Sequence, residues 1–163
     1  MKQVFSITAI LLLTISINYK ALAHCEVPCG IFHDELRIEL IKEHIQTIEK
    51  AMNQISELQS QDDEDYNQII RWVNTKEHHA NLIQEIASQY FLHQRVKFTD
   101  PADEEKYKKY IAQLTSLHQL VVYAMKSKQG LDLANIEKMQ QALAAFEEAY
   151  FGEHRHKLDG SHK

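Results

Sequence analysis

Residues that interrupt regular secondary structure are scarce in this chain. Its 163 residues include four glycines and two prolines. These residues fall at the ends of long periodic segments, which is where residues that break helices are expected. The scarcity of breakers therefore indicates a chain built from a few long helices.

Clusters of positive charge are also lacking. The formal net charge is −5, and no run of lysine and arginine is long enough to indicate nucleic-acid binding. The acidic balance argues mildly against an anionic partner, although a local positive field can still attract a small anion.

A single apolar run stands at the start of the chain, and no second run of membrane-spanning length follows it. A positive Lys2, a mostly apolar stretch over 4–17 and the pattern Ala-Leu-Ala at 21–23 follow the order of a secretory signal peptide. The run is shorter than the ~20 residues that span a bilayer. We therefore expect cleavage after Ala23, which removes residues 1–23, and export to the periplasm or the extracellular space without further membrane contact.

The two cysteines of the chain, Cys25 and Cys29, lie in nine residues that directly follow the expected cleavage site. In an exported protein two cysteines commonly form a disulfide, although this bridge would close a very small loop and stabilise the fold little. Alternatively, cleavage gives His24 a free α-amino group beside its imidazole, the next amide nitrogen and two thiolates, which together can bind a metal. The spacing fits neither a common zinc pattern nor the Cys-x-x-Cys of thioredoxin-like redox sites.

Apolar residues that recur every three or four positions mark the first two helices. The first helix is expected over residues 34–58. Its stripe consists of Ile38, Ile41, Ile45, Ile48, Met52 and Ile55. A polar loop over residues 59–64 separates it from the second helix, which is expected over residues 65–93.

Capping and breaking residues mark the other two helices. The sequence Thr-Asp-Pro at 99–101 predicts the start of the third, with proline at the first helical position. Gly130 ends this helix, and Asp132 is a cap for the fourth. Four helices with short connections predict an all-α fold, an antiparallel up-and-down four-helix bundle over residues 33–153, followed by a frayed tail over residues 154–163.

Two polar residues, Lys76 and His79, interrupt the apolar stripe of the second helix on the side that should face the core. A lysine whose ammonium group reaches solvent and a histidine hydrogen-bonded to a carboxylate account for them. A second metal site is less favoured, because no Glu-x-x-His pairs recur on the facing helices as di-iron bundles require. The histidines of the tail are expected to be solvated.

The residues His24–Phe32, called the hook below, resemble a known metal-binding segment. They read His-Cys-Glu-Val-Pro-Cys-Gly-Ile-Phe. Nickel-containing superoxide dismutases carry His-Cys-x-x-Pro-Cys-Gly-x-Tyr at a processed N-terminus, so the fixed positions match except the last, where Phe32 replaces tyrosine. Weaker matches follow at Arg37-Ile38-Glu39, Ile70-Arg71, Lys76-Glu77 and Tyr90-Phe91.

The resemblance implies a nickel ion that cycles between Ni(II) and Ni(III). Aqueous nickel(II) is hard to oxidise, whereas thiolates and a deprotonated amide are strong donors, and square-planar nitrogen and sulfur ligation suits nickel(II). The implied ligands are the amine of His24, the amide nitrogen of Cys25 and the sulfurs of Cys25 and Cys29, with the His24 imidazole as axial ligand. Pro28 is expected to shape the turn after a cis bond, and Gly30 lets the backbone continue.

The resemblance also implies residues that support these ligands. Glu39 matches the glutamate that accepts a hydrogen bond from the axial imidazole, a common arrangement at metal sites. His79 takes the place of an arginine behind that glutamate. Phe32 removes a phenol hydroxyl near the metal, and Tyr90, which matches a second family tyrosine, is expected to carry that role alone.

The expected function is that of an exported nickel superoxide dismutase with superoxide as its small-molecule partner. The resemblance implies a homohexamer in which neighbouring subunits cover each hook. Apolar residues near helix ends agree with such subunit contacts; they are Phe91, Leu92, Phe98 and Phe151. The alternative is an exported non-enzymatic helical protein, either disulfide-bonded or a carrier of copper or nickel.

Overall fold

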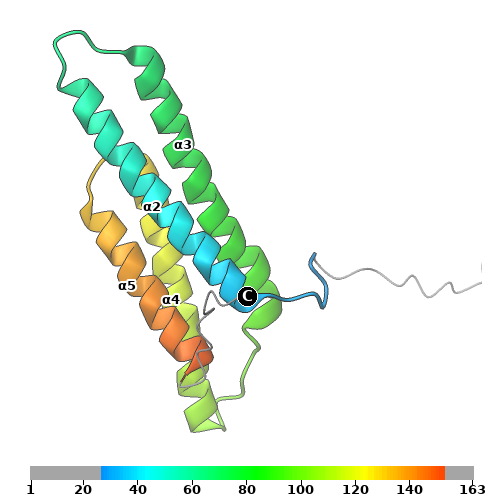
Figure 1. Ribbon diagram of the computed structural model, residues 1–163. Helices are drawn as coiled ribbons and strands as arrows, with labels where there is room; N and C mark the ends of the chain where they lie inside the picture. Colours follow the sequence, from blue (N-terminus) through cyan, green and yellow to red (C-terminus); the bar gives the residue numbers. More distant parts are fainter. Residues whose placement is uncertain (1–26, 153–163) are drawn as a thin grey trace, which may run out of the picture.

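Residues 27–152 are described in the computed structural model, and within them there are four long helices and no strand (Figure 1). The helices are α2 (Asp34–Gln59), α3 (Tyr66–Glu85), α4 (Glu104–Gln129) and α5 (Ala134–Phe151). The π-helix η1 (Ile86–Arg95) continues α3 without a break.

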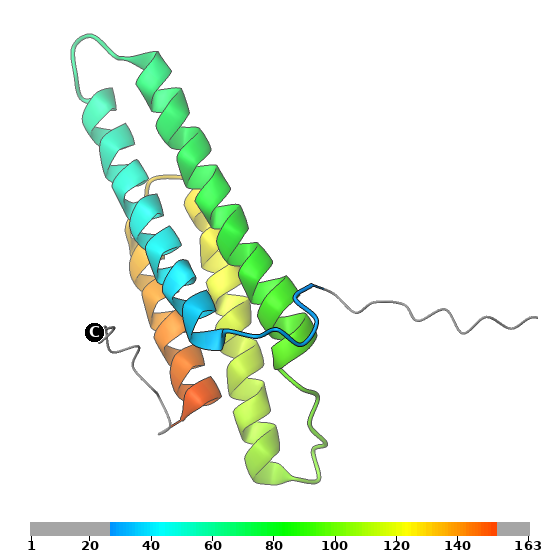
Figure 2. The same cartoon turned by 45° about the vertical axis from the view of Figure 1, so that its right-hand side comes forward.

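The helices form an antiparallel up-and-down bundle, as the sequence predicts. Helix α2 packs beside α3 and α5, and α4 packs beside the same two helices, so each helix has two neighbours (Figure 1). The loop between α2 and α3 lies at one end of this helix pair, and the described part of the hook lies at the other end (Figure 2). The hook therefore joins the bundle where α2 begins and η1 ends.

The isoleucine stripe of α2 supplies the centre of the core. Its members are each at most 2% exposed: Ile38, Ile41, Ile45, Ile48, Met52 and Ile55. All of them except Ile55 belong to one buried cluster with Leu117 and Leu120 of α4 and Phe146 of α5. Burying one such side chain contributes about 1.5–3 kcal/mol, so this stripe is a main source of stability and its prediction is confirmed.

The start of α4 differs from the prediction. The sequence places Pro101 at the first helical position, but this residue lies in a turn before the helix. The helix begins at Glu104, and its N-cap is Asp103, whose carboxylate accepts a hydrogen bond from the amide of Lys106 at 3.3 Å. Asp103 is the better cap because Glu104 and Glu105 add negative charge at the positive end of the helix.

The other helix ends lie close to their predicted positions. Helix α2 ends at Gln59, directly after the expected last residue, and α4 ends with Gly130 as its C-cap. Helix α5 begins at Ala134, whose amide donates a hydrogen bond to the carboxylate of Asp132 at 3.0 Å. Asp132 therefore satisfies an amide at the start of this helix, as a capping residue should.

The second helix continues past its predicted end at His93, and its last ten residues form η1. The amide of Val96 donates to the carbonyl of Phe91 at 2.8 Å, which is the wider spacing of a π-helix. Periodicity did not predict this change of pitch. Short π-helical segments often occur at functional sites, and this one lies beside the hook (Figure 2).

Lys76 is 3% exposed. The prediction that its ammonium group reaches the solvent is therefore wrong. Its ammonium group donates hydrogen bonds to the carbonyl oxygens of Ser127 and Lys128, both at 2.7 Å. These carbonyls belong to the last turn of α4, where a helix has unpaired acceptors and a partial negative charge. The buried lysine thus ties α3 to the end of α4.

Apolar residues near the helix ends are arranged differently from the prediction. Phe91 is fully buried, because its ring packs against Phe146 of α5 with 4.8 Å between the ring centres. Leu92 and Phe151 are partly buried against the core. Phe98 is 80% exposed, as expected of a residue available for contact with another subunit.

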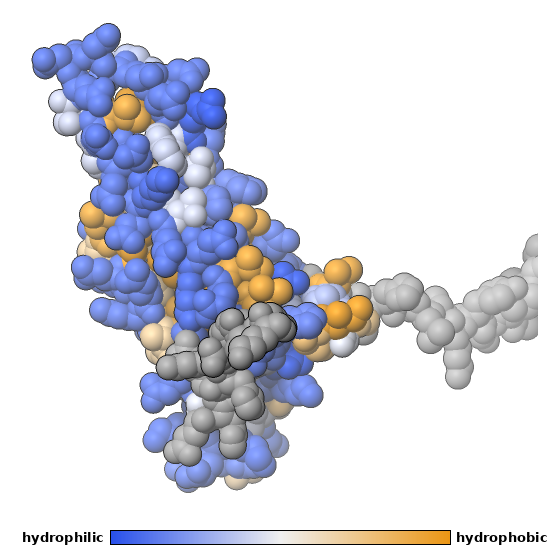
Figure 3. Space-filling view, in the orientation of Figure 1, coloured by the Kyte–Doolittle hydropathy of each residue, from blue (hydrophilic) through white to orange (hydrophobic). Residues whose placement is uncertain are grey.

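The surface around the hook is apolar. Val27 and Ile31 are 85% and 72% exposed, and Leu36 on the first turns of α2 is 50% exposed. Figure 3 shows hydrophobic side chains gathered where the hook leaves the bundle. Within the described residues, no helix is long and apolar enough to cross a bilayer.

Candidate metal centre

The described part of the hook is a tight turn. The Val27–Pro28 bond is cis, as the resemblance implies, and the amide of Ile31 donates to the carbonyl of Pro28 at 3.0 Å. Gly30 has a φ of 87°, a left-handed conformation that other residues adopt only with strain. Proline and glycine therefore reverse the chain direction within a few residues.

This turn presents the thiol of Cys29 to solvent. Cys29 itself has a positive φ of 29°, and its thiol is free and exposed rather than buried in the core. An exposed thiol on a turn can act as a metal ligand once it is deprotonated. His24 and Cys25, the other expected ligands, lie outside the described residues.

Hydrogen bonds from η1 hold the base of the hook. The side-chain amide of Gln94 donates to the carbonyl of Val27 at 3.0 Å. The hydroxyl of Tyr90 accepts a hydrogen bond from the amide of His33, the residue that follows the hook, at 2.8 Å. These bonds fix the backbone on both sides of the turn.

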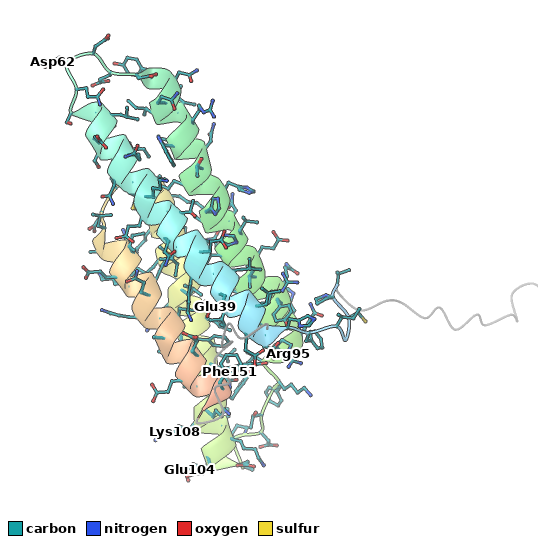
Figure 4. All side chains as sticks on the ribbon, viewed as in Figure 1. Glu39, Asp62, Arg95, Glu104, Lys108 and Phe151 are labelled. Carbon is teal, nitrogen blue, oxygen red and sulfur yellow. The ribbon has the colours of Figure 1, made fainter. Side chains whose placement is uncertain are left out.

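Ring contacts from η1 hold Phe32. The ring of Tyr90 meets it edge to face, with 5.8 Å between the ring centres. The guanidinium carbon of Arg95 lies 4.3 Å from the centre of the Phe32 ring, a favourable cation–π distance. Arg95 lies beside the start of α2 in Figure 4. Phe32 is thus an anchoring residue, although it lacks the phenol of the family pattern.

One carboxylate, that of Asp34 at the start of α2, joins three elements. Its Oδ1 accepts hydrogen bonds from the Tyr90 hydroxyl at 2.6 Å and from Arg95 Nε at 2.9 Å. Its Oδ2 accepts from Arg95 Nη2 at 2.6 Å and from the hydroxyl of Tyr150 at 2.8 Å. Asp34 therefore connects α2 with η1 and with the end of α5.

The charges in this cluster stabilise one another. Burial alone would raise the pKa of Asp34, but hydrogen bonds from Arg95, Tyr90 and Tyr150 and the charge of Arg95 outweigh it, so its pKa is lowered. Burial and the hydrogen bond to Asp34 raise the pKa of Tyr90 to about 12, and the same causes raise the pKa of Tyr150. The carboxylate is therefore ionised at neutral pH, and both phenols keep their protons.

A pocket of about 380 Å³ lies between the hook base and the helices α2 and α3. Val27 and Pro28 line it on the hook side, and Arg37, Leu40 and His44 line it on the α2 side. The guanidinium carbon of Arg37 also lies 5.0 Å from the centre of the Tyr90 ring, which helps to line the pocket. Arg37 thus brings a positive charge to this pocket for a small anion, and Glu85 of α3, which also lines it, offsets part of that charge.

The predicted hydrogen bond between His79 and a carboxylate is absent from the described residues, and His79 has another histidine as its partner. Its Nδ1 lies 3.0 Å from Nδ1 of His44, which lines the pocket. One of these nitrogens must carry a hydrogen and the other must accept it. Burial and, for His44, the neighbouring His79 lower the pKa of both rings, so the pair resists double protonation.

Glu39 lies on a different side of α2 from the pocket. Its carboxylate accepts a hydrogen bond from Lys42 at 2.8 Å, and Lys42 also bonds to Glu147 of α5 at 3.0 Å. The side chain of Glu39 is 53% exposed, so its carboxylate is open to solvent (Figure 4). The structure brings His79 to His44 and places Glu39 on the side of α5.

Sequence patterns missed the residues that organise the hook base. Asp34 was noted only as the first residue of a helix, and Arg95 lies beyond the predicted end of the second helix. His44 and Tyr150 do not belong to any functional motif that the sequence analysis recognised. Their partners are far apart in sequence, so only the packing of the helices brings these groups together.

The comparisons with known proteins give one match. The family model described as nickel-containing superoxide dismutase matches residues 19–154, which is most of the chain. Neither the curated proteins nor the solved structures give a match. The matched region includes the whole hook and all four helices.

Proposed function

The chain belongs to the nickel-containing superoxide dismutase family, and from this premise we propose that the hook holds its nickel ion. The protein is an oxidoreductase that converts superoxide into dioxygen and hydrogen peroxide, with nickel as its cofactor. The family match, which covers the hook and the bundle together, is the observation that carries this conclusion.

The donor chemistry of the hook fits nickel. Cys29 offers a free and exposed thiol, and thiolate sulfur together with nitrogen suits nickel(II). We propose that the amine and imidazole of His24 and the amide nitrogen and thiolate of Cys25 complete the ligand set. When bound, nickel supplies one-electron chemistry through the Ni(II) and Ni(III) states. Because the cysteines bind as thiolates, nickel binding releases protons and weakens in acid.

Positive charge at the hook base suits an anionic substrate. Arg37 and Arg95 lie over the rings of Tyr90 and Phe32, respectively. The charge of Arg95 is balanced by Asp34, which leaves Arg37 as the stronger local source of positive potential. We propose that Arg37 attracts superoxide toward the pocket beside the hook.

The residues behind the ligands have separate roles in this proposal. Glu39 is open to solvent and can accept a hydrogen bond from the His24 imidazole, as the resemblance implies. His79 acts with His44 at the pocket beside the hook rather than behind Glu39. Tyr90 holds the backbone at His33.

The proposed amine ligand of His24 requires processing of the chain. We propose that residues 1–23 are a signal peptide, that cleavage after Ala23 frees the amine of His24, and that the protein is exported. The order of charge, apolar run and small residues supports this proposal. The family match begins at residue 19 and leaves most of the apolar run outside it.

We propose that the protein assembles into a homohexamer that covers the hooks. Val27, Ile31 and Phe98 are each at least 72% exposed, and such exposed apolar groups are typical of subunit contacts. The resemblance supplies the number of subunits. Light scattering on the nickel-loaded protein tests the proposal, and an active monomer at assay dilution would contradict it.

Metal analysis and superoxide decay on the chain that begins at His24 test the proposed function. We expect nickel in equal amount to the chain, rapid decay of superoxide and a rhombic paramagnetic nickel signal after oxidation. A disulfide between Cys25 and Cys29, or bound copper or nickel without dismutation, would instead support the non-enzymatic alternative.

A further inference from the structure

The π-helical end of α3 positions the hook base through two residues that share a partner. Tyr90 accepts the hydrogen bond of the His33 amide, and Arg95 covers the ring of Phe32. Both side chains also bond to the carboxylate of Asp34. Two of the contacts that fix the hook base are therefore fixed in turn by one group, beside the separate bond from Gln94 to Val27.

The bonds to Asp34 are short and directional. The Tyr90 hydroxyl lies 2.6 Å from Oδ1, and Arg95 reaches both oxygens through Nε and Nη2. Hydrogen bonds to an ionised group are stronger than neutral ones, and the two-pronged contact of arginine also fixes orientation. Without the carboxylate, the hydroxyl hydrogen of Tyr90 and the guanidinium group of Arg95 would both lose the acceptor that orients them.

We propose that Asp34 is a positioning residue for the nickel hook, and that Tyr90 transmits its effect as an anchor rather than as a proton donor. This inference rests on the proposed function, in which the hook holds nickel. The hydrogen of the Tyr90 hydroxyl points to Asp34, and its oxygen accepts the His33 amide. Tyr90 therefore has no second hydrogen to give to a substrate while the contact stands.

A variant of Tyr150 distinguishes a positioning role of Asp34 from a role in the general stability of the bundle. Its hydroxyl also donates to Asp34, at 2.8 Å, but it comes from α5 and not from η1. Tyr150→Phe removes a bond on the α5 side and keeps the bonds to Tyr90 and Arg95. A residue that serves only the stability of the bundle would make Asp34→Asn and Tyr150→Phe behave alike.

Hydrogen exchange at the His33 amide tests the inference in metal-free protein. The chain that begins at His24 is compared with its Asp34→Asn and Tyr90→Phe variants by nuclear magnetic resonance. We expect exchange at this amide to rise about five- to tenfold in both, the change expected for loss of about one hydrogen bond. Tyr150→Phe should change it less than about twofold. Asp62→Asn, in the loop at the far end of α2 (Figure 4), is the matched control.

Nickel release and the pH dependence of turnover complete the test. We expect Asp34→Asn and Tyr90→Phe to lose nickel about ten- to a hundredfold faster, as is usual for residues that support ligands. The pH profile of kcat in Tyr90→Phe should keep its shape, because the phenol is not the donor.

Two results would overturn the inference. His33 exchange in Asp34→Asn and Tyr90→Phe equal to that of Tyr150→Phe would show that Asp34 serves only stability. A changed pH profile in Tyr90→Phe would show that the phenol does deliver a proton. If His33 exchange rises as expected but the unaltered chain binds no nickel, the positioning role of Asp34 is supported and the proposed function is contradicted. The failure of the inference and the failure of the proposed function are therefore distinguishable.

Discussion

The middle of the bundle and its hook end are held together by different interactions. In the middle, isoleucines of α2 such as Ile41 and Ile48 have no exposed surface and meet apolar residues of the other helices. At the hook end, a carboxylate, two phenols and a guanidinium group join α2, η1 and α5. Apolar burial is non-directional, whereas hydrogen bonds depend on distance and angle. The middle therefore supplies stability, and the hook end supplies a fixed position.

The largest difference between an effect on activity and an effect on stability is expected for Cys29→Ser, at the hook. A hydroxyl is a poor substitute for a thiolate ligand, so turnover should fall by more than about 100-fold, beyond the range typical of residues that only support a ligand. The thiol is exposed, so the metal-free protein should keep its stability within about 0.5 kcal/mol. Superoxide decay and urea unfolding of the metal-free form measure the two effects. Normal dismutation by this variant would remove Cys29 from the site.

The reverse effect is expected for Ile45→Ala in the middle of the bundle. Ile45 is 1% exposed, and truncation of a buried isoleucine costs about 2–5 kcal/mol of unfolding free energy. Turnover per nickel-loaded, folded molecule should stay close to normal, because the ligands lie elsewhere. A large loss of turnover with unchanged stability would break the proposed division between core and hook.

Glu39→Gln tests whether a residue of the second turn of α2, on the side of α5, also serves the hook. If Glu39 supports the His24 imidazole, turnover should fall about ten- to a hundredfold while nickel stays bound, and this is the outcome we expect. Glu49→Gln, farther along the same helix, is the control for loss of one negative charge. Equal turnover in the two variants would leave Glu39 as a partner of Lys42 alone.

The smallest effect concerns the pair of His44 and His79. The pKa of both rings is lowered from 6.5, so the folded state binds fewer protons than the unfolded state. Stability should therefore fall as the pH drops below about 6.5, and it should be fully present above that value. Glu43 opposes this shift for both rings, and His78 adds to it.

His79→Gln should flatten the pH dependence of stability. This variant removes one of the two titrating rings and takes the charge of His79 away from His44, while burial and His78 still act on His44, so a smaller slope should remain. Urea unfolding between pH 5 and 7 measures the slope, and His118→Gln, an exposed histidine of α4, is the control. Equal slopes in the unaltered chain and in His79→Gln would show that the pair does not control acid stability.

The sequence predicted most of the fold, and the hook pattern predicted the family that the family model confirms. The spacing of the apolar residues from Ile38 to Ile55 located α2, because a helix that packs on a core needs an apolar residue on each turn. This pattern is visible in the local sequence whatever the helix packs against. The predicted start of α4 was wrong because both Pro101 and Asp103 are residues typical of a helix start. The negative charges that follow Asp103 favour the helix that begins after it.

The organisation of the hook base could not be predicted in the same way. Asp34 meets Tyr90, Arg95 and Tyr150 across separations of 56, 61 and 116 residues. The pitch of η1 decides which side chains of this segment face the hook, and it leaves no periodic signal in the sequence. His79 was likewise recognised as inward-facing, but its partner became apparent only from the packing of α3 against α2.

The central claim is that a chain terminus at His24 completes the nickel site. The most direct test compares the chain that begins at His24 with a chain that retains Ala23 before it. In the longer chain the amine of His24 becomes part of a peptide bond and the imidazole is displaced, so we expect a folded protein with little nickel and little dismutation. The shorter chain should bind nickel and remove superoxide rapidly. Equal nickel content and equal superoxide decay in both chains would contradict the account.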